Sequence, residues 1–483
     1  MPGENVCATK GLLPRMKSLT VWQKTAATVL LLVLAVVYVC ALWPAVATRS
    51  HADAEFLLAA QSLAHGHGFP PAAHFPPLFP ALLALFALVS TDPHWLKLLP
   101  LLCAAGWFRA ITALLRRMGA SPWAAFLIAC ATLAAPGVVD AATSLSAEPL
   151  FALLITMSLV LVLDGRMAMA GVVAGLSVAT SMAGVTLIAA CILILTLGRR
   201  LGDAVRYTVA AMAVAAPAIG WTVAHAGAHY GSWNVLTGLH ASEKAAVLGH
   251  NAYWIALAPF ELLSGVSSEN AAAISTGILL WSWFRRRLLM PDLFLFLYLL
   301  AVAGWSWLPT RSLTVVLPFV LWLAYRAFRG MRSKEAFAAF VVLGVGLPVG
   351  CSLYRIPLTL RPDPAQPLYA WIRTNTPANA TILANLDANM ALQTGRASVR
   401  GIDPTGYDLW YAPRAESAVN AAMLLRTVRV DAPDYVVITP DDNLPESAPW
   451  RKAVEALERA GVLEAVPVPG LSKECRLLRT VGR

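Results

Sequence analysis

Residues 50–56 read SHADAEF and place two carboxylates, Asp53 and Glu55, directly after the first long apolar run of the chain. That run covers 25–47, which exceeds the roughly 20 apolar residues that a helix needs to cross a bilayer. Ionisable side chains at the end of a membrane span are costly to bury, so they often have a function. Ser50 and Asp53 also fit the Ser-x-x-Asp capping pattern, in which the acid only stabilises a helix N-terminus. The stretch therefore predicts a membrane protein with a functional carboxylate or a helix cap where the chain first leaves the membrane.

The composition is that of an α-helical, polytopic membrane protein. Of the 483 residues, 58% are hydrophobic and 13% are charged, whereas soluble domains carry about 25% charged residues. The net charge of +10 lies mainly in short loops between apolar runs, where basic residues set the orientation of a membrane protein. We therefore expect a lipid bilayer, and no nucleic acid, as a partner. Cys475 is the only one of the seven cysteines well inside the polar tail, which excludes a disulfide framework there.

The apolar runs predict about eleven transmembrane helices within a membrane domain at 25–353. The expected spans are 25–47, 95–115, 121–140, 147–164, 167–181, 184–198, 204–226, 270–285, 291–308, 312–328 and 335–353. Basic clusters of the loops, such as Arg116–Arg117 and Arg199–Arg200, fall on the same side as residues 1–24. Because basic loops stay in the cytoplasm, the N-terminus is expected to be cytoplasmic.

The remaining long segments are expected on the outer side of the membrane. The first outer loop, 48–94, contains a short proline-rich part at 76–90 that is expected to lie in the outer interface, as is 251–265. In 354–483 long apolar runs stop and short strand-like and helix-like segments alternate, which predicts a small extracytoplasmic α/β domain. Its expected elements are helices near 365–374, 414–427 and 448–460 and strands near 381–384, 434–438, 462–468 and 475–480.

Further charged residues stand at the predicted outer ends of spans. Glu148 lies in the stretch 146–151 at the start of a span, and Asp140 nearby is a weaker candidate of the same kind. The alternative for Glu148 is an exposed acid at a helix N-terminus beside a proline. Arg311 is a lone arginine in an outer loop, against the positive-inside bias. It either anchors its helix at the interface or holds an anion such as phosphate.

Four histidines crowd the first outer loop: His51, His65, His67 and His74. Together with the nearby carboxylates they offer ligands that a divalent metal accepts. Their spacing matches no strong zinc signature, so we favour solvated histidines, or histidines that contact a donor or acceptor, over a metal site. We expect no metal and no other cofactor.

Several short sequence motifs occur in a characteristic order along nearly the whole chain. They are 53–56, 60–68 and 75–80 in the first outer loop, then 146–151, 171–176, Arg311 with 316–318, 371–377 and 394–396. In this order they resemble GT-C glycosyltransferases, the lipid-linked-sugar enzymes related to protein O-mannosyltransferases and to bacterial aminoarabinose transferase. The sequence departs from the family at two points. Ala54 separates two acids that are often adjacent, and no arginine follows Gly175 in the segment 180–184.

The resemblance implies a GT-C fold and an inverting transfer of a sugar from a polyprenyl-phosphate donor to an acceptor hydroxyl at the outer face of a bacterial inner membrane. Arg311 would neutralise the donor phosphate, since a phosphate leaving group needs a cation rather than a general acid. Asp53 would take the proton of the acceptor hydroxyl, while Glu55 and Glu148 would orient the acceptor or tune the base. The acceptor is expected to be a glycan, a glycolipid or a protein.

Two other functions stay open. A catalytically inactive protein of the same fold would bind the lipid-linked sugar or act as a scaffold, and the missing arginine after Gly175 slightly favours it. A lipid or solute transporter usually has paired repeats and polar residues near the membrane midplane. Here the candidate charges cluster at one face, so a glycosyltransferase is the preferred interpretation.

Overall fold

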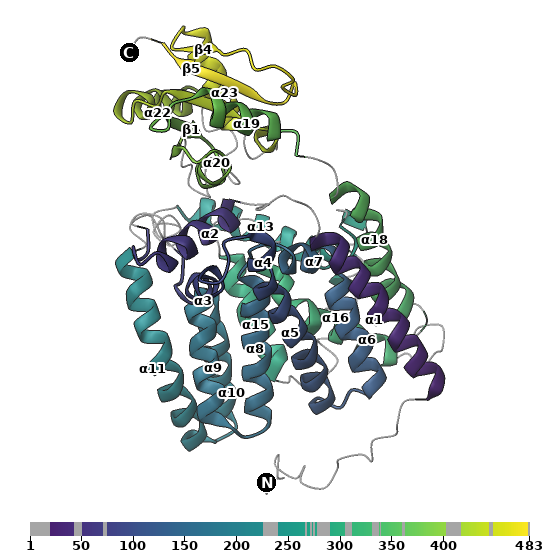
Figure 1. The fold of residues 1–483 in the computed structure, drawn as a ribbon. Helices are drawn as coiled ribbons and strands as arrows, with labels where there is room; N and C mark the ends of the chain where they lie inside the picture. Colours follow the sequence, from purple (N-terminus) through teal and green to yellow (C-terminus); the bar gives the residue numbers. More distant parts are fainter. Residues whose placement is uncertain are drawn as a thin grey trace, which may run out of the picture.

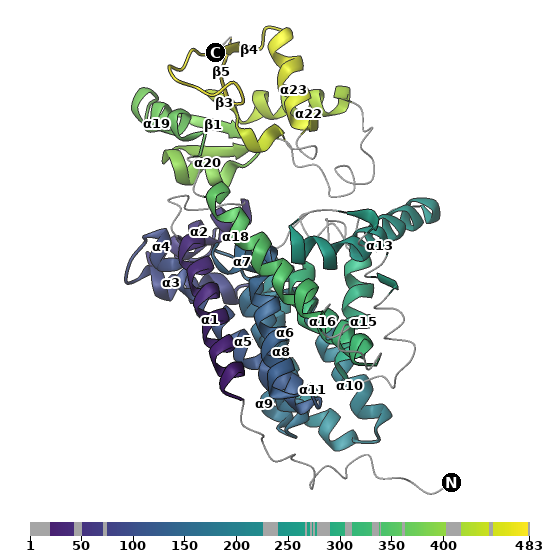
Figure 2. The ribbon, with the colours of Figure 1, turned by 90° about the vertical axis from the view of Figure 1, so that its right-hand side faces the viewer.

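The chain forms a bundle of long helices and a smaller α/β domain made by its C-terminal residues (Figure 1). The computed structural model describes residues 20–42, 51–70, 75–225, 240–265, 268–270, 273, 276–277, 290–304, 312–330, 338, 340–359, 363–401, 417–443 and 448–481. The α/β domain lies over one end of the bundle (Figures 1 and 2). We call that end the domain-facing end and the opposite one the far end.

Apolar helices run between these two ends. They are α1 (Val21–Leu42), α5 (Leu98–Arg117), α6 (Pro122–Ala134), α8 (Glu148–Leu163), α9 (Met167–Thr180), α10 (Val185–Leu197, after the turn η1, Met182–Gly184), α11 (Leu201–His225), α15 (Met290–Ala303), α16 (Leu317–Gly330, after η3, Ser312–Val316) and α18 (Leu347–Thr359, after η4, Val342–Gly346). The break at Ser181 confirms the predicted boundary between two of the spans. Among the described residues, three helices are long and apolar enough to cross a membrane, and the bent pair α6–α7 adds a fourth if it is one span. Most of the predicted span 270–285 lies outside the described residues.

The segment predicted as one span at 121–140 is bent in the structure. Helix α6 ends at Ala134, and α7 (Pro136–Ala142) follows it at an angle of 70°. Pro136 causes the bend, because it has no N–H to continue the helix and it holds Ala135 in an extended conformation. One span was predicted at 121–140 and this bend was not anticipated, since the apolar run continues through the proline.

Helices α9 and α11 pack with their backbones in close approach. A Cβ atom added to Gly175 would lie 2.6 Å from the carbonyl oxygen of Ala211, and one added to Gly171 would clash with the carbonyl oxygen of Tyr207. Small residues allow such contact between membrane helices. These two glycines of the stretch 171–176 therefore serve helix packing.

Short helices cover the domain-facing end of the bundle. They are α2 (His51–Ala64), α3 (Leu78–Ala87) and α4 (Pro93–Leu96), and α13 (Ala241–Ser264) also lies at this end (Figures 1 and 2). Helix α3 has 10 residues and packs against α2. Its length is roughly 15 Å, which is about half of the hydrocarbon core of a bilayer.

The α/β domain contains a five-stranded sheet of order β2-β1-β3-β5-β4. Its strands are β1 (Thr381–Ala384), β2 (Ala397–Arg400), β3 (Tyr435–Ile438), β4 (Leu463–Ala465) and β5 (Arg476–Thr480), and its helices are α19 (Gln366–Asn375), α20 (Asp387–Thr394), α22 (Ser417–Val430) and α23 (Ala448–Arg459). Strand β1 pairs in parallel with β2 on one side and with β3 on the other. Strand β5 pairs antiparallel with both β3 and β4.

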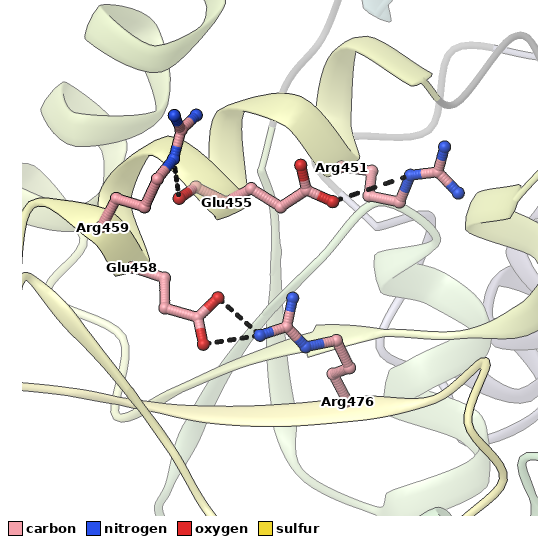
Figure 3. A network of polar contacts seen from close by, with 5 residues as sticks. All are labelled: Arg451, Glu455, Glu458, Arg459 and Arg476. Carbon is pink, nitrogen blue, oxygen red and sulfur yellow. Dashed lines mark hydrogen bonds and ion pairs between the residues drawn. The ribbon is translucent and has the colours of Figure 1, made fainter.

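One ion pair fastens α23 to the sheet, and two further polar contacts lie within α23 (Figure 3). Arg476 of β5 binds the carboxylate of Glu458, and Arg459 donates to the Glu455 carbonyl oxygen at 3.3 Å. Arg451 lies 4.0 Å from the Glu455 carboxylate. Because these side chains are partly solvated, each pair contributes about 0–1 kcal/mol, and most of the stability of the domain comes from its apolar core.

The α/β domain contacts the bundle through α20 and α2. Leu392 of α20 packs against the apolar cluster to which Leu57 and Ala60 of α2 belong. The domain therefore rests on the helix that carries Asp53 and Glu55.

Candidate functional site

Helix α2 holds both carboxylates of the stretch 50–56 at the domain-facing end. Asp53 lies in the first turn and is 1% exposed, whereas Glu55 is half-buried. Both carry interactions with other groups. Burial of a carboxylate costs free energy unless hydrogen bonds or cations compensate its charge. A capping acid stabilises a helix equally well at the surface, so the depth of Asp53 favours a function over capping.

Glu148 is the first residue of α8 and is half-buried. The buried hydroxyl of Ser146 donates a hydrogen bond to its carboxylate. This bond comes from a residue only two positions earlier, so it fixes the carboxylate where the chain turns into the helix. Glu148 therefore stands at the entrance of α8 in a defined orientation.

One apolar cluster connects the element that carries Asp53 with the one that carries Glu148. Leu57 of α2 belongs to it, as do Leu145 and Leu150 on either side of Glu148. Apolar side chains of α3 fill the cluster between them, among them Phe79 and Leu83. The fold thus brings two acids that are far apart in the sequence to the same side of the bundle.

A buried lysine, which the sequence analysis missed, lies in this region. Lys97 joins α4 to α5 and is 1% exposed, and its neighbours Leu96 and Leu99 belong to the same apolar cluster. Lys97 has a partner in the structure. Because a buried ammonium needs hydrogen bonds or negative charge around it, it marks a polar site within this cluster. The signal that could have revealed it is a charge inside the predicted span 95–115.

The turn η3 lies beside α8 and leads toward the same end. The Tyr298 hydroxyl donates to the carbonyl oxygen of Ser312 at 2.8 Å. The ring centroid of Tyr298 is 6.4 Å from that of Phe151, which follows Glu148 by one turn of α8. Ser312 comes directly after Arg311 in the sequence, and Arg311 itself lies outside the described residues.

An apolar cavity of about 190 Å³ lies against η3, the turn that begins at Ser312. Its wall includes Leu313 of η3, Leu295 and Leu299 of α15, and Ile255, Pro259 and Leu262 of α13. An apolar cavity of roughly 150 Å³ stays dry and accepts benzene. This cavity therefore has the size and lining to hold a segment of hydrocarbon chain.

Two of the predicted loop histidines are visible with their side chains. His65 and His67 are exposed in the turn after α2, with ring centroids 6.2 Å apart, and the ring of His65 is 2.7 Å from the Gln61 carbonyl oxygen. The side chain of His51 and all of His74 lie outside the described residues. Within the described part of the chain, no group of three or more His, Cys, Asp or Glu side chains could hold a metal ion.

Asp140 takes part in an ion pair between helices. One of its carboxylate oxygens lies 3.2 Å from the guanidinium of Arg355. Arg355 belongs to α18, the last helix before the α/β domain, so the pair fastens α7 to α18. This contact gives Asp140 a structural role.

The comparisons with known proteins concern the fold. No family model matches the sequence, and no curated protein matches it significantly. The crystal structure of ArnT from Cupriavidus metallidurans in the apo state matches with a TM-score of 0.51 and 12% identity, covering 94% of this chain and 98% of that one. The structure of the same protein bound to undecaprenyl phosphate matches with a TM-score of 0.52 and 13% identity, covering 95% and 98%. The chain has the GT-C fold.

A further similarity is with the cryo-EM structure of the arabinosyltransferase EmbB from Mycobacterium smegmatis, at 16% identity and a TM-score of 0.33, covering 73% of this chain and 42% of that chain. The ArnT matches confirm, for the fold, the resemblance to GT-C glycosyltransferases that the sequence motifs predict. Within this GT-C fold, Asp53, Glu55 and Glu148 come to the domain-facing end together with Lys97.

Proposed function

We propose that this protein transfers a sugar from a polyprenyl-phosphate donor to an acceptor hydroxyl, with inversion at the anomeric carbon. One observation carries the proposal: a chain with the GT-C fold has an apolar cavity among α13, α15, η3 and α16, and it buries Asp53 and Lys97 at the domain-facing end of the same bundle. Such a donor needs both features, since its tail is a hydrocarbon and its head is an anion. One of the similar ArnT structures is bound to undecaprenyl phosphate.

The donor would lie with its tail in the cavity and its phosphate near Ser312. As the sugar leaves, negative charge grows on the phosphate, and cations already in place stabilise it. Arg311 is proposed for this role because a guanidinium offers paired donors to phosphate. Lys97 is proposed as a second cation because it is buried in the same end of the bundle.

Asp53 is proposed as the base. The acceptor oxygen attacks the anomeric carbon from the side opposite the phosphate, and the bond between that carbon and the phosphate oxygen breaks. The electron pair of this bond leaves with the phosphate, and the proton of the acceptor hydroxyl passes to the Asp53 carboxylate. Glu55 and Glu148 would orient the acceptor. One base acting on the face opposite the leaving group gives an inverted product.

The domain-facing end is proposed to be the outer face of the membrane. Basic side chains such as Arg116, Arg117 and Arg200 stand where α5 ends and α11 begins, at the far end. Basic residues of this kind remain on the cytoplasmic side. The α/β domain and the acceptor would then both be extracytoplasmic.

The test is turnover by the purified full chain in detergent. A panel of undecaprenyl-phosphate monosaccharides, each labelled in the sugar, is incubated with an envelope extract as the source of acceptor. We expect the label to move from one donor into the extract, and NMR of the product to show the inverted anomer. Protein heated before the reaction is the control.

A different result would favour another function. If the protein binds undecaprenyl phosphate and no label leaves any donor, the chain is a binding or scaffold protein. If the intact donor instead crosses the bilayer of proteoliposomes, the chain is a transporter. A product with retained configuration would refute the single-base mechanism.

A further inference from the structure

Two of the short sequence motifs, 371–377 and 394–396, have no part in the proposed chemistry, and they meet in the α/β domain. The first forms the end of α19, and the second covers the last residue of α20 and the two residues that follow. Figure 1 shows α20 on the side of the domain that faces the bundle, next to α2. The two motifs therefore meet in the part of the domain that contacts the helix of Asp53.

Each of the two helix ends binds an arginine from the other motif. The usual donor to the Arg373 carbonyl oxygen is missing, because the residue four positions later is Pro377, which has no N–H. Nη2 of Arg396 donates to this oxygen at 2.8 Å and to the Thr376 carbonyl oxygen at 3.0 Å. Nη1 of Arg373 in turn donates to the Gln393 carbonyl oxygen of α20 at 2.9 Å. We call this reciprocal arrangement the Arg373–Arg396 clamp.

The geometry of the clamp requires a guanidinium group. Nε of Arg396 also donates to the Thr376 hydroxyl at 3.2 Å, so one side chain bonds to three oxygens. The planar fork of arginine serves several acceptors at once, whereas the ammonium of lysine is a point charge. Positive charge is also favourable at the carbonyl end of a helix. Gly395, with φ of +66°, makes the left-handed turn between α20 and Arg396.

Helix α20 is too short to be stable without such contacts. It has 8 residues, and isolated helices shorter than about 12–15 residues are marginal in water. The bond from Arg373 reaches Gln393, whose neighbour Leu392 is the side chain by which α20 packs against the apolar cluster of α2. The clamp therefore acts on the part of α20 that contacts the bundle.

Helix α2 in turn depends on α20 for its position. Among the described elements, its most extensive contacts are with α3 and α20. Leu57 belongs to the cluster that Leu392 joins, and it follows Asp53 by one turn of α2. A displacement of α20 would remove one of the two supports of α2 and let the Asp53 carboxylate move. A base must lie within hydrogen-bond reach of its substrate, so a shift of about 1 Å is costly for the rate.

We propose that Arg396 and Arg373 are positioning residues, which hold α20 against α2 and thereby hold the helix of Asp53 in place. The consequence for sugar transfer rests on the proposed function, whereas the support of α2 by the clamp does not. Through the clamp, the α/β domain acts on the reaction without touching the reacting atoms.

The first test is hydrogen exchange of the purified full chain in detergent, followed by mass spectrometry of peptides from 51–64. We expect α2 to exchange about tenfold faster in Arg396→Gln, the effect of a lost hydrogen bond to a charged group. Arg396→Lys keeps the charge and should exchange faster as well, because it loses the fork. Arg373→Gln removes one bond of an exposed side chain, so it tests the clamp with a smaller rise and little risk to folding.

The matched control is Arg459→Gln in the same domain. Arg459 also donates to a helix carbonyl oxygen, that of Glu455 at 3.3 Å, but both residues belong to α23. The extensive contacts of α23 among the described elements are with α22, β4 and η5, and not with α20 or α2. This variant should leave the exchange of α2 unchanged.

The second test is the turnover of the same variants. Arg396→Gln should lower kcat about 10- to 100-fold through the misplaced base, with the KM for the donor unchanged. The donor site is expected to stay intact because α13, α15, η3 and α16 line most of the proposed cavity. Arg459→Gln should transfer sugar at the normal rate. A role in the stability of the α/β domain alone would lower its unfolding temperature and leave kcat of the folded protein unchanged.

Three results would overturn the proposal. They are unchanged exchange of α2 in folded Arg396→Gln and Arg373→Gln, an equal rise in Arg459→Gln, and a raised KM for the donor at constant kcat. If the unchanged protein shows no turnover, the proposed function fails, and faster exchange of α2 in the clamp variants still supports the clamp.

Discussion

Two sets of charged side chains at opposite ends of the helical bundle differ in their exposure to solvent. At the far end, Arg117 and Asp164 face each other across α5 and α8 with two contacts of 2.6 and 2.8 Å, and both side chains are about one-third exposed, at 36% and 31%. At the domain-facing end, Asp53 and Lys97 are each 1% exposed. Solvated pairs stabilise a fold weakly, whereas buried charges are expensive and persist where they have a function. The exposed pair is an ordinary surface interaction, whereas Asp53 and Lys97 are candidates for a function; the pair Arg326–Asp292, buried at the far end, shows that burial alone does not separate the two ends.

Replacement of the buried acid should have the largest effect. We expect Asp53→Asn to lower kcat by about 10²–10⁴-fold, because the acceptor proton loses its base. The purified protein should still bind undecaprenyl phosphate, because the change leaves the proposed cations and the apolar cavity in place. Sugar transfer is measured from the labelled donor.

The matched control applies the same change to the far end. Asp164→Asn removes an equal charge from the exposed pair with Arg117, and transfer should continue at the normal rate. Normal transfer by Asp53→Asn, or an equal loss of transfer in Asp53→Asn and Asp164→Asn, would contradict a catalytic role that is specific to Asp53.

A buried pair at the far end tests whether burial alone marks a function. Arg326 of α16 lies 3.3 Å from Asp292 of α15, and both side chains are nearly inaccessible. We expect Arg326→Met to lower the free energy of unfolding by about 3–5 kcal/mol, because the buried Asp292 carboxylate loses the guanidinium that faces it. Thermal unfolding in detergent measures the loss.

Adding Asp292→Asn to Arg326→Met should restore part of that stability, since the stranded charge is removed. Folded molecules of either variant should transfer sugar at the normal rate. A stable variant with no transfer would show that the far end contributes to catalysis and would remove the proposed difference.

Between the two ends, backbone contact holds the helices together. We expect Gly171→Ala to destabilise the bundle by about 1–3 kcal/mol, because the added methyl group meets the Tyr207 carbonyl oxygen of α11. The control is Gly202→Ala on α11, where an added Cβ has no atom within 4 Å and helix propensity favours alanine. Equal unfolding temperatures for the two variants would mean that the close approach of α9 and α11 does not contribute to the stability of the bundle.

The smallest effect is expected for the exposed pair at the far end. Arg117→Gln should change the free energy of unfolding by about 0–1 kcal/mol and leave transfer unchanged, because solvent screens the interaction with Asp164. The measurement is again thermal unfolding, repeated at raised salt, where the difference from the unchanged protein should shrink. A loss as large as that of Arg326→Met would contradict the distinction between solvated and buried charges.

Much of the fold follows from patterns within single segments of the sequence. Apolar length located most helices of the bundle, and short β-branched runs located β1 and β3 to within a residue. Strand β2 was missed because Ala397–Arg400 is a half-exposed edge strand with no apolar run. Helix α20 was missed because its eight residues stand between two strands, and the bend at Pro136 was missed because its neighbours are apolar.

The candidate site was predictable only in part. Asp53 and Glu148 stood out as acids at the ends of spans, and the resemblance to GT-C enzymes supplied their roles. Lys97 did not stand out, because it was counted as part of an apolar span. Its neighbours Leu96 and Leu99 pack in one cluster with residues of α2, α3 and the segment around Leu145, which are distant in sequence.

The most direct test of the central claim is a cryo-EM structure of the full chain with undecaprenyl phosphate. The account predicts the phosphate at the domain-facing end, beside Ser312 and within reach of Lys97 or Arg311, with the first isoprene units in the cavity lined by Leu313, Leu295 and Pro259. A phosphate at the far end, or a lipid bound only on the outer surface of the bundle with Asp53 remote from it, would contradict the account.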